Sequence, residues 1–147
     1  YAERRVAATS AGLFDLDAWM VRLYGPDPRP TEGVMAWYLE RRERCRSLIW
    51  SLALATVNCG TDVILELGLL AAAERDVFYR QVQAEELGLR VVLLDAPRDV
   101  RRDRVLARNQ SGRPFTQIVP PMFFERASDA WEPPTELERR TWAITDA

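Results

Sequence analysis

Apolar and polar positions follow two different periods along the chain, which predicts helices alternating with short strands. Residues 1–9 and 31–57 have helical spacing, and the second stretch is nearly all apolar after residue 47. Residues 13–16, 62–68 and 89–94 are short runs of branched apolar residues, as is typical of buried strands. Strands that alternate with helices predict an α/β fold with a mainly parallel sheet.

The second half of the chain continues this pattern. Helices are predicted for residues 71–87, 98–109, 122–131 and 135–140, and a last short strand for 141–145. The chain has 147 residues, the size of one ordinary domain. Hydrophobic residues make up 48%, so the chain can bury a core. We therefore expect a single folded domain.

The charged residues limit the partners that the protein can bind and the reactions that it can catalyse. There are 20 basic and 22 acidic residues and a net charge of −2, which argues against bulk nucleic-acid binding or a polybasic membrane anchor. Every basic residue is an arginine, and the sequence has neither lysine nor histidine. These absences exclude a Ser-His-Asp triad, a Schiff-base lysine and a histidine metal site within this chain. The chemistry is left to carboxylates, arginines and the backbone.

The cysteines and the apolar runs bear on the cellular compartment and on membrane association. Cys45 and Cys59 are too few for a disulfide scaffold or a zinc site, and they read as reduced thiols of a cytoplasmic protein. The longest uncharged run, residues 47–61, is interrupted by polar residues and is shorter than the about 20 apolar residues of a membrane span. We therefore expect no association with a membrane.

Acidic residues at the ends of predicted strands are candidates for catalysis. Ligands of parallel sheets bind beyond the carboxyl ends of the strands, which points to Asp15 and Asp17, to Glu66 and to Asp95. Asp17 can accept a proton from a substrate hydroxyl, although Asp15 or Asp17 can equally cap the next helix. Glu66 can hold the water shell of Mg²⁺ beside a nucleotide, or be an ordinary acid at a strand end.

Arginines gather in two predicted helices. Arg101, Arg104 and Arg108 share one face of the later helix, where guanidinium groups suit phosphate oxygens. The alternative is a solvated face whose arginines pair with Asp99 and Asp103. The earlier cluster is interleaved with Glu40 and Glu43 and is interpreted as solvated surface; it contains Arg41, Arg42, Arg44 and Arg46.

Four segments, taken in order, resemble the small P-loop kinase-like ATPases. They are FDLDAWMVRLYGPD, DVILELGLLAAAERD, VVLLDAPRDVRRDRVLARN and IVPPMFFERASDAWEPPTELE. This group includes AAA-domain, zeta-toxin-like and polynucleotide-kinase-like phosphotransferases, and the resemblance covers essentially the whole chain. It implies one P-loop NTPase domain over residues 1–147, a three-layer sandwich with a helical lid that binds ATP and Mg²⁺.

The resemblance also implies roles for single residues. Asp17 falls on the position of the general base that faces the acceptor hydroxyl. Arg108 and Arg113 match the lid pattern that contacts ATP phosphates, with one extra residue between them, and Arg104 would assist. Glu66 stands where many relatives have an aspartate and would act on the metal through water.

The resemblance implies less about the site that binds the phosphate acceptor. Its candidate residues are Asp15, Trp19 and Arg22. Some relatives have an arginine three residues after the base, where it holds a phosphate of the acceptor. Met20 takes that place here and Arg22 is nearby, so a phosphate-bearing acceptor is not implied.

One motif of the family is missing from this sequence, the phosphate loop G-x-x-x-x-G-K-[S/T]. It is expected directly before the helix of residues 1–9. Either the first strand and the loop precede Tyr1 in the natural protein, which we favour because the sheet would otherwise lack its central strand, or the domain has lost them.

Three functions follow. The first is an ATP-dependent phosphotransferase, a small kinase that moves the γ-phosphate to a hydroxyl of a small molecule or nucleotide. The second is a non-catalytic nucleotide-binding or interaction domain. The third is a nucleoside-triphosphate hydrolase that controls a partner. The sequence leaves the acceptor and the oligomeric state open.

Overall fold

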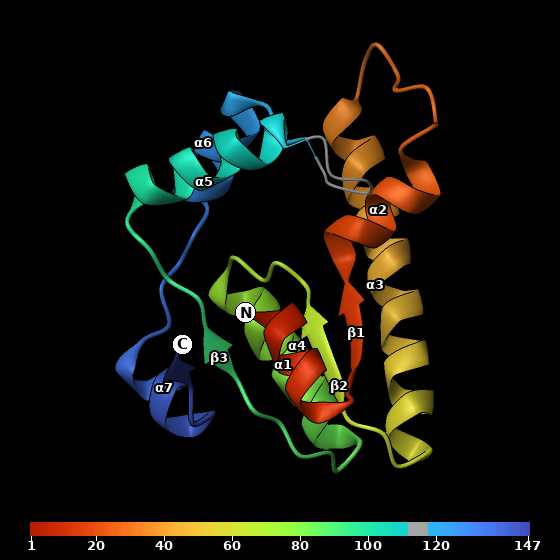
Figure 1. Ribbon diagram of the computed structural model, residues 1–147, viewed down its shortest axis with the longest axis vertical. Helices are drawn as coiled ribbons and strands as arrows, with labels where there is room; N and C mark the ends of the chain where they lie inside the picture. The colour runs from red at the N-terminus through yellow and green to blue at the C-terminus, as the bar shows by residue number, and fades with distance from the viewer. Residues whose placement is uncertain (112–117) are drawn as a thin grey trace. The chain divides into compact units, whose positions relative to one another are not determined.

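The computed structural model describes residues 1–111 and 118–147 and consists of helices alternating with short strands (Figure 1). The chain forms two compact units, the first mainly Tyr1–Gly68 and the second mainly Leu69–Gln110 and Val119–Ala147. Both strand pairs of the described residues are parallel. The α/β class predicted from the sequence is therefore confirmed.

The first unit is built on the strand pair β1–β2. Its elements are α1 (Ala2–Thr9), β1 (Gly12–Asp15), α2 (Leu16–Tyr24), α3 (Val34–Asn58) and β2 (Val63–Glu66). The register runs from Gly12 opposite Val63 to Asp15 opposite Glu66. Helices α1 and α3 both pack on this strand pair (Figure 1). The parallel register brings the carboxyl ends of β1 and β2 side by side.

An apolar stripe along α3 forms the core of the first unit. Cys45, Ile49 and Ala53 recur every fourth residue and are buried, with Ile49 0% exposed. Helix α2 contributes Leu16 and Met20 and packs against α3. Residues four apart lie on one face of a helix, so this spacing fixes which side of α3 turns inward.

The second unit contains four helices and a shorter strand pair. Its elements are α4 (Ala72–Ala84), β3 (Val92–Leu93), α5 (Arg98–Gln110), α6 (Pro121–Asp129), α7 (Glu136–Thr141) and β4 (Thr145–Asp146). Helix α4 is held to α7 by a buried ion pair, in which Arg75 Nε lies 2.5 Å from Glu138 Oε1 and Nη2 lies 3.0 Å from Oε2. This two-pronged contact satisfies a guanidinium that is 4% exposed.

The predicted elements differ from the structure mainly at their ends. The first strand ends at Asp15 instead of Leu16, because Asp15 caps the next helix, which begins at Leu16. The strand predicted for 89–94 pairs only at Val92–Leu93, since its partner β4 has two residues. Helix α7 continues to Thr141 and takes up the beginning of the strand predicted for 141–145. No helix within the described ranges is both long and apolar enough to span a membrane.

Candidate active site at the carboxyl ends of β1 and β2

Asp15 and Glu66 lie opposite each other in the last register position of β1 and β2. The Oδ1 atom of Asp15 accepts a hydrogen bond from the backbone N–H of Ala18 at 3.1 Å. Asp15 is therefore the N-cap of α2, which confirms the capping alternative for this residue. Its carboxylate also keeps negative charge at the edge of the sheet.

Asp17 lies in the first turn of α2, two residues beyond the end of β1. The sequence predicted that it follows the strand directly; the capping by Asp15 instead starts the helix at Leu16. Leu16 is buried while Asp17 is exposed, so the helix turns the carboxylate of Asp17 away from the core.

Glu66 ends β2 and lies in an acidic environment. Partial burial raises the pKa of its carboxyl group, and the negative charges of Asp15 and then Asp17 raise it further. Asp15 and Asp17 are thus near enough to Glu66 to repel its negative charge, while the N-terminal ammonium group acts in the opposite direction. A bound cation would relieve this repulsion.

Direct coordination of a metal by several protein ligands is not supported. Within residues 1–111 and 118–147, no three acidic, cysteine or histidine side chains come together as metal ligands. Mg²⁺ usually keeps several of its own waters and needs only one or two carboxylates. A role of Glu66 that acts on the metal through water stays a prediction.

Two residues of α3 lie near these strand ends: Arg42, which the sequence assigned to solvated surface, and Tyr38, which the sequence did not single out. The Nη2 atom of Arg42 donates to the carbonyl oxygens of Leu67 at 3.3 Å and Gly68 at 2.8 Å. Gly68 has a φ of +59°, a conformation that glycine adopts at little cost. Arg42 thereby fastens the middle of α3 to the backbone that leaves β2.

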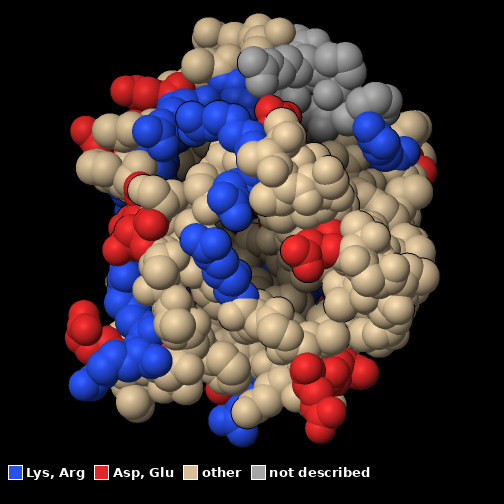
Figure 2. Space-filling model, turned by 60° about the horizontal axis from the view of Figure 1, so that its bottom comes forward, with Lys and Arg blue, Asp and Glu red and all other residues tan. Residues whose placement is uncertain are grey.

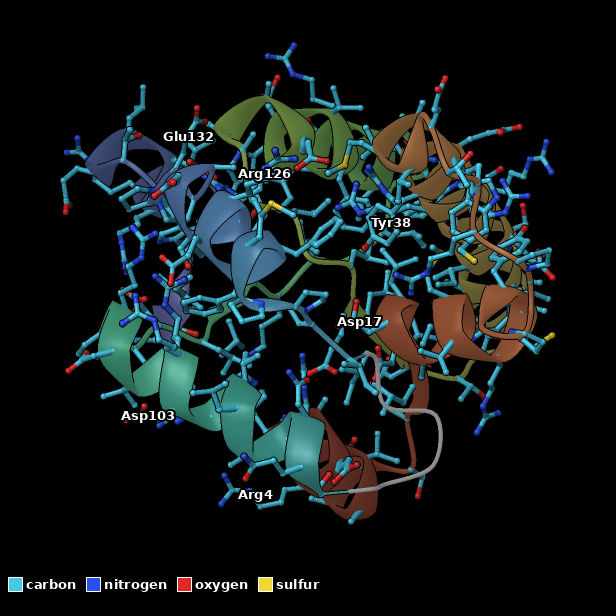
Figure 3. All side chains as sticks on the ribbon, turned by 90° about the horizontal axis from the view of Figure 1, so that it is seen from above. Arg4, Asp17, Tyr38, Asp103, Arg126 and Glu132 are labelled. Atoms are coloured by element: carbon cyan, nitrogen blue, oxygen red, sulfur yellow. The ribbon has the colours of Figure 1, made fainter. Side chains whose placement is uncertain are left out.

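Tyr38 precedes Arg42 by one helical turn and is half-buried. Burial raises the pKa of the Tyr38 phenol, the negative charge of Asp17 raises it further, and the positive charge of Arg42 lowers it. Figure 3 shows Asp17 at the beginning of α2 and Tyr38 on the neighbouring helix α3. Spacing of four residues between Tyr38 and Arg42 is the signal that places both on one helix face.

The interpretation of the α3 arginines as solvated surface is therefore wrong for Arg41 and Arg42, and also for Arg46, whose side chain is only 18% exposed. Arg42 binds backbone carbonyls, and the guanidinium of Arg41 lies 4.1 Å from the Trp37 ring centroid and 5.4 Å from that of Tyr24. Arg44 fits the interpretation, since its side chain is 62% exposed and pairs with Glu40 one turn away. Arg41 and Arg42 thus differ from Arg44 because they contact Tyr24 and Gly68, which lie outside α3.

The predicted acceptor residues lie on α2. The ring of Trp19 packs on Phe14 of β1, with 6.2 Å between the ring centroids. Met20 is 5% exposed and belongs to the core, so its place offers no group to an acceptor. Arg22 is exposed in the last turn of α2, toward the end opposite Asp17.

The predicted phosphate-binding arginines belong to the second unit. Arg104 is exposed and Arg108 half-buried on α5, whereas Arg113 lies outside the described residues. The side chain of Asn109 clamps Val119 at both its N–H and its C=O, with distances of 3.1 and 2.8 Å. This clamp fixes the end of α5 directly after Arg108.

Other arginines of α5 have acidic partners on α6. Arg98 and Arg102 both bind Glu125, and Arg98 also lies 2.8 Å from Asp129. These ion pairs involve other arginines than Arg101, Arg104 and Arg108, for which the pairing with Asp99 and Asp103 stays a prediction. Figure 2 likewise shows arginine and acidic side chains adjoining one another on the face drawn there.

A parallel strand pair with carboxylates at its carboxyl edge is the arrangement found at ligand sites of α/β proteins. A family model described as AAA domain matches residues 1–121, and the chain therefore belongs to this P-loop, kinase-like AAA-domain family. The resemblance seen in the sequence is confirmed, and with it the class of P-loop nucleotide-binding domain. Neither the curated proteins nor the solved structures provide a match.

Proposed function

We propose that the protein is an ATP-dependent phosphotransferase, a small kinase that moves the γ-phosphoryl group of ATP to a hydroxyl of a small molecule or nucleotide. One observation carries this proposal. Asp17 presents an exposed carboxylate just beyond the carboxyl end of β1, beside the strand end that carries Glu66. An acid at this edge of the sheet is in the position from which a general base reaches a bound acceptor.

In the transfer step, the acceptor oxygen forms a bond to the γ-phosphorus as the bond between that phosphorus and the ADP oxygen breaks. Asp17 receives the proton of the acceptor hydroxyl, and its exposed position leaves room for an acceptor. Catalysis of phosphoryl transfer consists mostly of positioning and of stabilising charge. Asp15 keeps Asp17 in place by fixing the first turn of α2.

Other residues would bind the reactants. Mg²⁺, when bound, neutralises charge that develops on the phosphates, and Glu66 would hold it through water. Arg104, Arg108 and Arg113 would contact ATP phosphates, while Trp19 and Arg22 would contact the acceptor. The glycine-rich loop and lysine that cradle phosphates in P-loop proteins are not among these 147 residues.

Transfer of labelled γ-phosphate tests the proposal. The full natural chain is incubated with ATP, Mg²⁺ and one of three probes: glucose, adenosine or kanamycin. Asp17→Asn should lower transfer about 10²- to 10⁴-fold, the usual contribution of a general base, with ATP binding nearly unchanged. Asp62→Asn is the matched control, because Asp62 is an exposed aspartate just before β2, at the opposite end of the strands. Equal activity of wild type and Asp17→Asn would disprove the role of Asp17.

The alternative function is a non-catalytic interaction domain that no longer binds nucleotide. A ligand that binds only the folded state must raise the melting temperature. Melting of the full natural chain with and without ATP and Mg²⁺ separates the two functions. The phosphotransferase requires a rise with nucleotide, whereas a domain that no longer binds nucleotide melts at the same temperature in both.

A further inference from the structure

Helix α5 has one half-buried face, and this face carries arginines. Its half-buried residues are Arg101, Val105, Arg108 and Asn109, at positions i, i+4, i+7 and i+8. In an ordinary surface helix these positions are apolar. On α5 only Val105 is apolar, whereas Leu106 points elsewhere and is 44% exposed. Two guanidinium groups thus stand where packing alone favours aliphatic side chains.

The side chain of Arg101 contains a buried donor. Its Nε atom has no hydrogen-bond partner among the residues that the structure describes. A buried N–H group without an acceptor is costly, and native proteins contain few of them. Those that occur are typical of places where a ligand, an ion or an ordered water supplies the acceptor. A bound anion would satisfy this donor of Arg101.

The neighbouring arginines have partners in α6, and these contacts fix α5. Arg98 and Arg102 both bind Glu125 of α6, which adjoins α5 (Figure 1). At the other end of α5, the side chain of Asn109 holds both backbone groups of Val119. Because the helix is held near both ends, its half-buried face is preorganised for a ligand.

A phosphate group is the anion that fits this face. A guanidinium group donates two parallel hydrogen bonds to phosphate oxygens, and arginine keeps its charge at any ordinary pH. Arg108, one of the predicted ATP-binding residues, lies seven residues further along, about two helical turns, on the same face. Two guanidinium groups on one helix face suit a ligand with several phosphates, such as a nucleoside triphosphate.

We propose that Arg101 is a further residue of the nucleotide site, and that its guanidinium group binds a phosphate of ATP together with Arg108. This inference rests on the nucleotide binding of the proposed phosphotransferase. The alternative is that Arg101 pairs with Asp99 or Asp103 on a solvated face, which the sequence left open.

Binding of AMPPNP, a non-hydrolysable analogue of ATP, tests the inference without turnover. Isothermal titration calorimetry of the full natural chain with AMPPNP and Mg²⁺ gives the Kd. Arg101→Met keeps an unbranched side chain in the half-buried position and removes the guanidinium group. We expect its Kd to rise about tenfold, equivalent to about 1.4 kcal/mol.

Arg102→Met is the matched control. Arg102 is adjacent in sequence and carries the same charge, but it binds Glu125 instead. Its substitution should leave the Kd for AMPPNP nearly unchanged. Equal weakening in both variants would overturn the inference, because only the overall positive charge of α5 would then matter.

Inorganic tripolyphosphate shows which part of the nucleotide Arg101 binds. It competes with AMPPNP for the phosphate site and lacks the nucleoside. In Arg101→Met, its affinity should fall by the same factor as that of AMPPNP. A fall for AMPPNP alone would overturn the inference, since Arg101 would then act on the nucleoside.

Melting of the ligand-free chain separates ligand binding from a structural role. If only the ligand satisfies the buried Nε of Arg101, Arg101→Met should not lower the melting temperature of the free protein. A lower melting temperature would mean that Arg101 stabilises the fold through its own contacts, and the inference would be wrong. An unchanged Kd for AMPPNP would also overturn it, and would assign Arg101 to a solvated face.

Failure of this inference is distinguishable from failure of the proposed function. If the wild type binds AMPPNP and phosphorylates glucose, adenosine or kanamycin, equal binding by Arg101→Met refutes the inference alone. If the wild type binds AMPPNP but phosphorylates none of these probes, the proposed transfer fails, and the Kd of Arg101→Met still decides the role of Arg101. If the wild type binds neither AMPPNP nor tripolyphosphate, both proposals fail.

Discussion

Helices α3 and α5 carry similar numbers of arginines and use them in different ways. On α3, Arg42 binds two backbone carbonyls of the strand end, and Arg41 lies between two aromatic rings. On α5, Arg98 and Arg102 form ion pairs with Glu125 near the surface, where their side chains are 41% and 45% exposed. The first set is part of the fold, and the second remains largely in solvent.

This difference decides what each helix can offer a ligand. A guanidinium bonded to main-chain carbonyls stabilises its own unit, because losing it leaves the part-buried carbonyl of Leu67 without this donor. Exposed ion pairs contribute little stability. We therefore keep the prediction of phosphate binding for Arg104 and Arg108 of α5, whereas Arg42 of α3 stabilises the first unit.

Removal of Arg42 should have the largest effect. Arg42→Ala deletes the hydrogen bonds to Leu67 and Gly68, and hydrogen bonds of charged groups contribute about 1.5–3 kcal/mol. We expect a loss of about 2 kcal/mol in the free energy of unfolding, measured by urea titration, together with a loss of phosphate transfer.

Arg44→Ala is the control on the same helix. Its side chain is 62% exposed and pairs with Glu40 one turn away, a surface contact worth at most a few tenths of a kcal/mol. If Arg42→Ala and Arg44→Ala were equally stable, the contrast between buried and exposed arginines of α3 would not hold.

Removal of Arg108 should have a smaller and purely functional effect. Arg108→Ala is expected to raise the KM for ATP about tenfold, equivalent to about 1.4 kcal/mol, with little change in melting temperature. Arg102→Ala serves as the control, since Arg102 already binds Glu125. Equal KM values in the two variants would mean that Arg108 does not bind ATP and belongs to a solvated helix face, the alternative that the sequence left open.

Much of this fold follows from local pattern. Branched apolar runs located β1 and β2, and helical spacing located α3, because burial on one side imposes a period that the sequence displays. The acids at the strand ends were found because the carboxyl edge of a parallel sheet is defined by strand direction alone. Asp15 as the cap and Glu66 at the edge were both predictable on these grounds.

The roles of the α3 residues were not predictable in the same way. Arg41, Arg42 and Arg44 are alike in local sequence, and the contacts that separate Arg41 and Arg42 from Arg44 include Tyr24 and Gly68, which lie outside α3. Tyr38 gave no signal beyond its spacing from Arg42. The ends of short strands were also missed, since pairing with β4 decides how much of residues 89–94 is a strand.

Substitution of Glu125 should have the smallest effect. It tests how much the exposed ion pairs of α5 contribute to stability in acid. Hydrogen bonds from Arg102 and then Arg98 hold the pKa of its carboxyl group below the ordinary 4.5. A lowered pKa stabilises the folded state at pH above 4.5, and this contribution is lost as the pH falls through the folded-state pKa. Glu125→Gln should therefore flatten the decline of melting temperature in acid, and high salt should reduce its difference from the wild type. Glu32→Gln, at an exposed glutamate before α3, should leave the decline unchanged; an equal response of both variants would mean that the ion pairs of α5 do not set the acid stability.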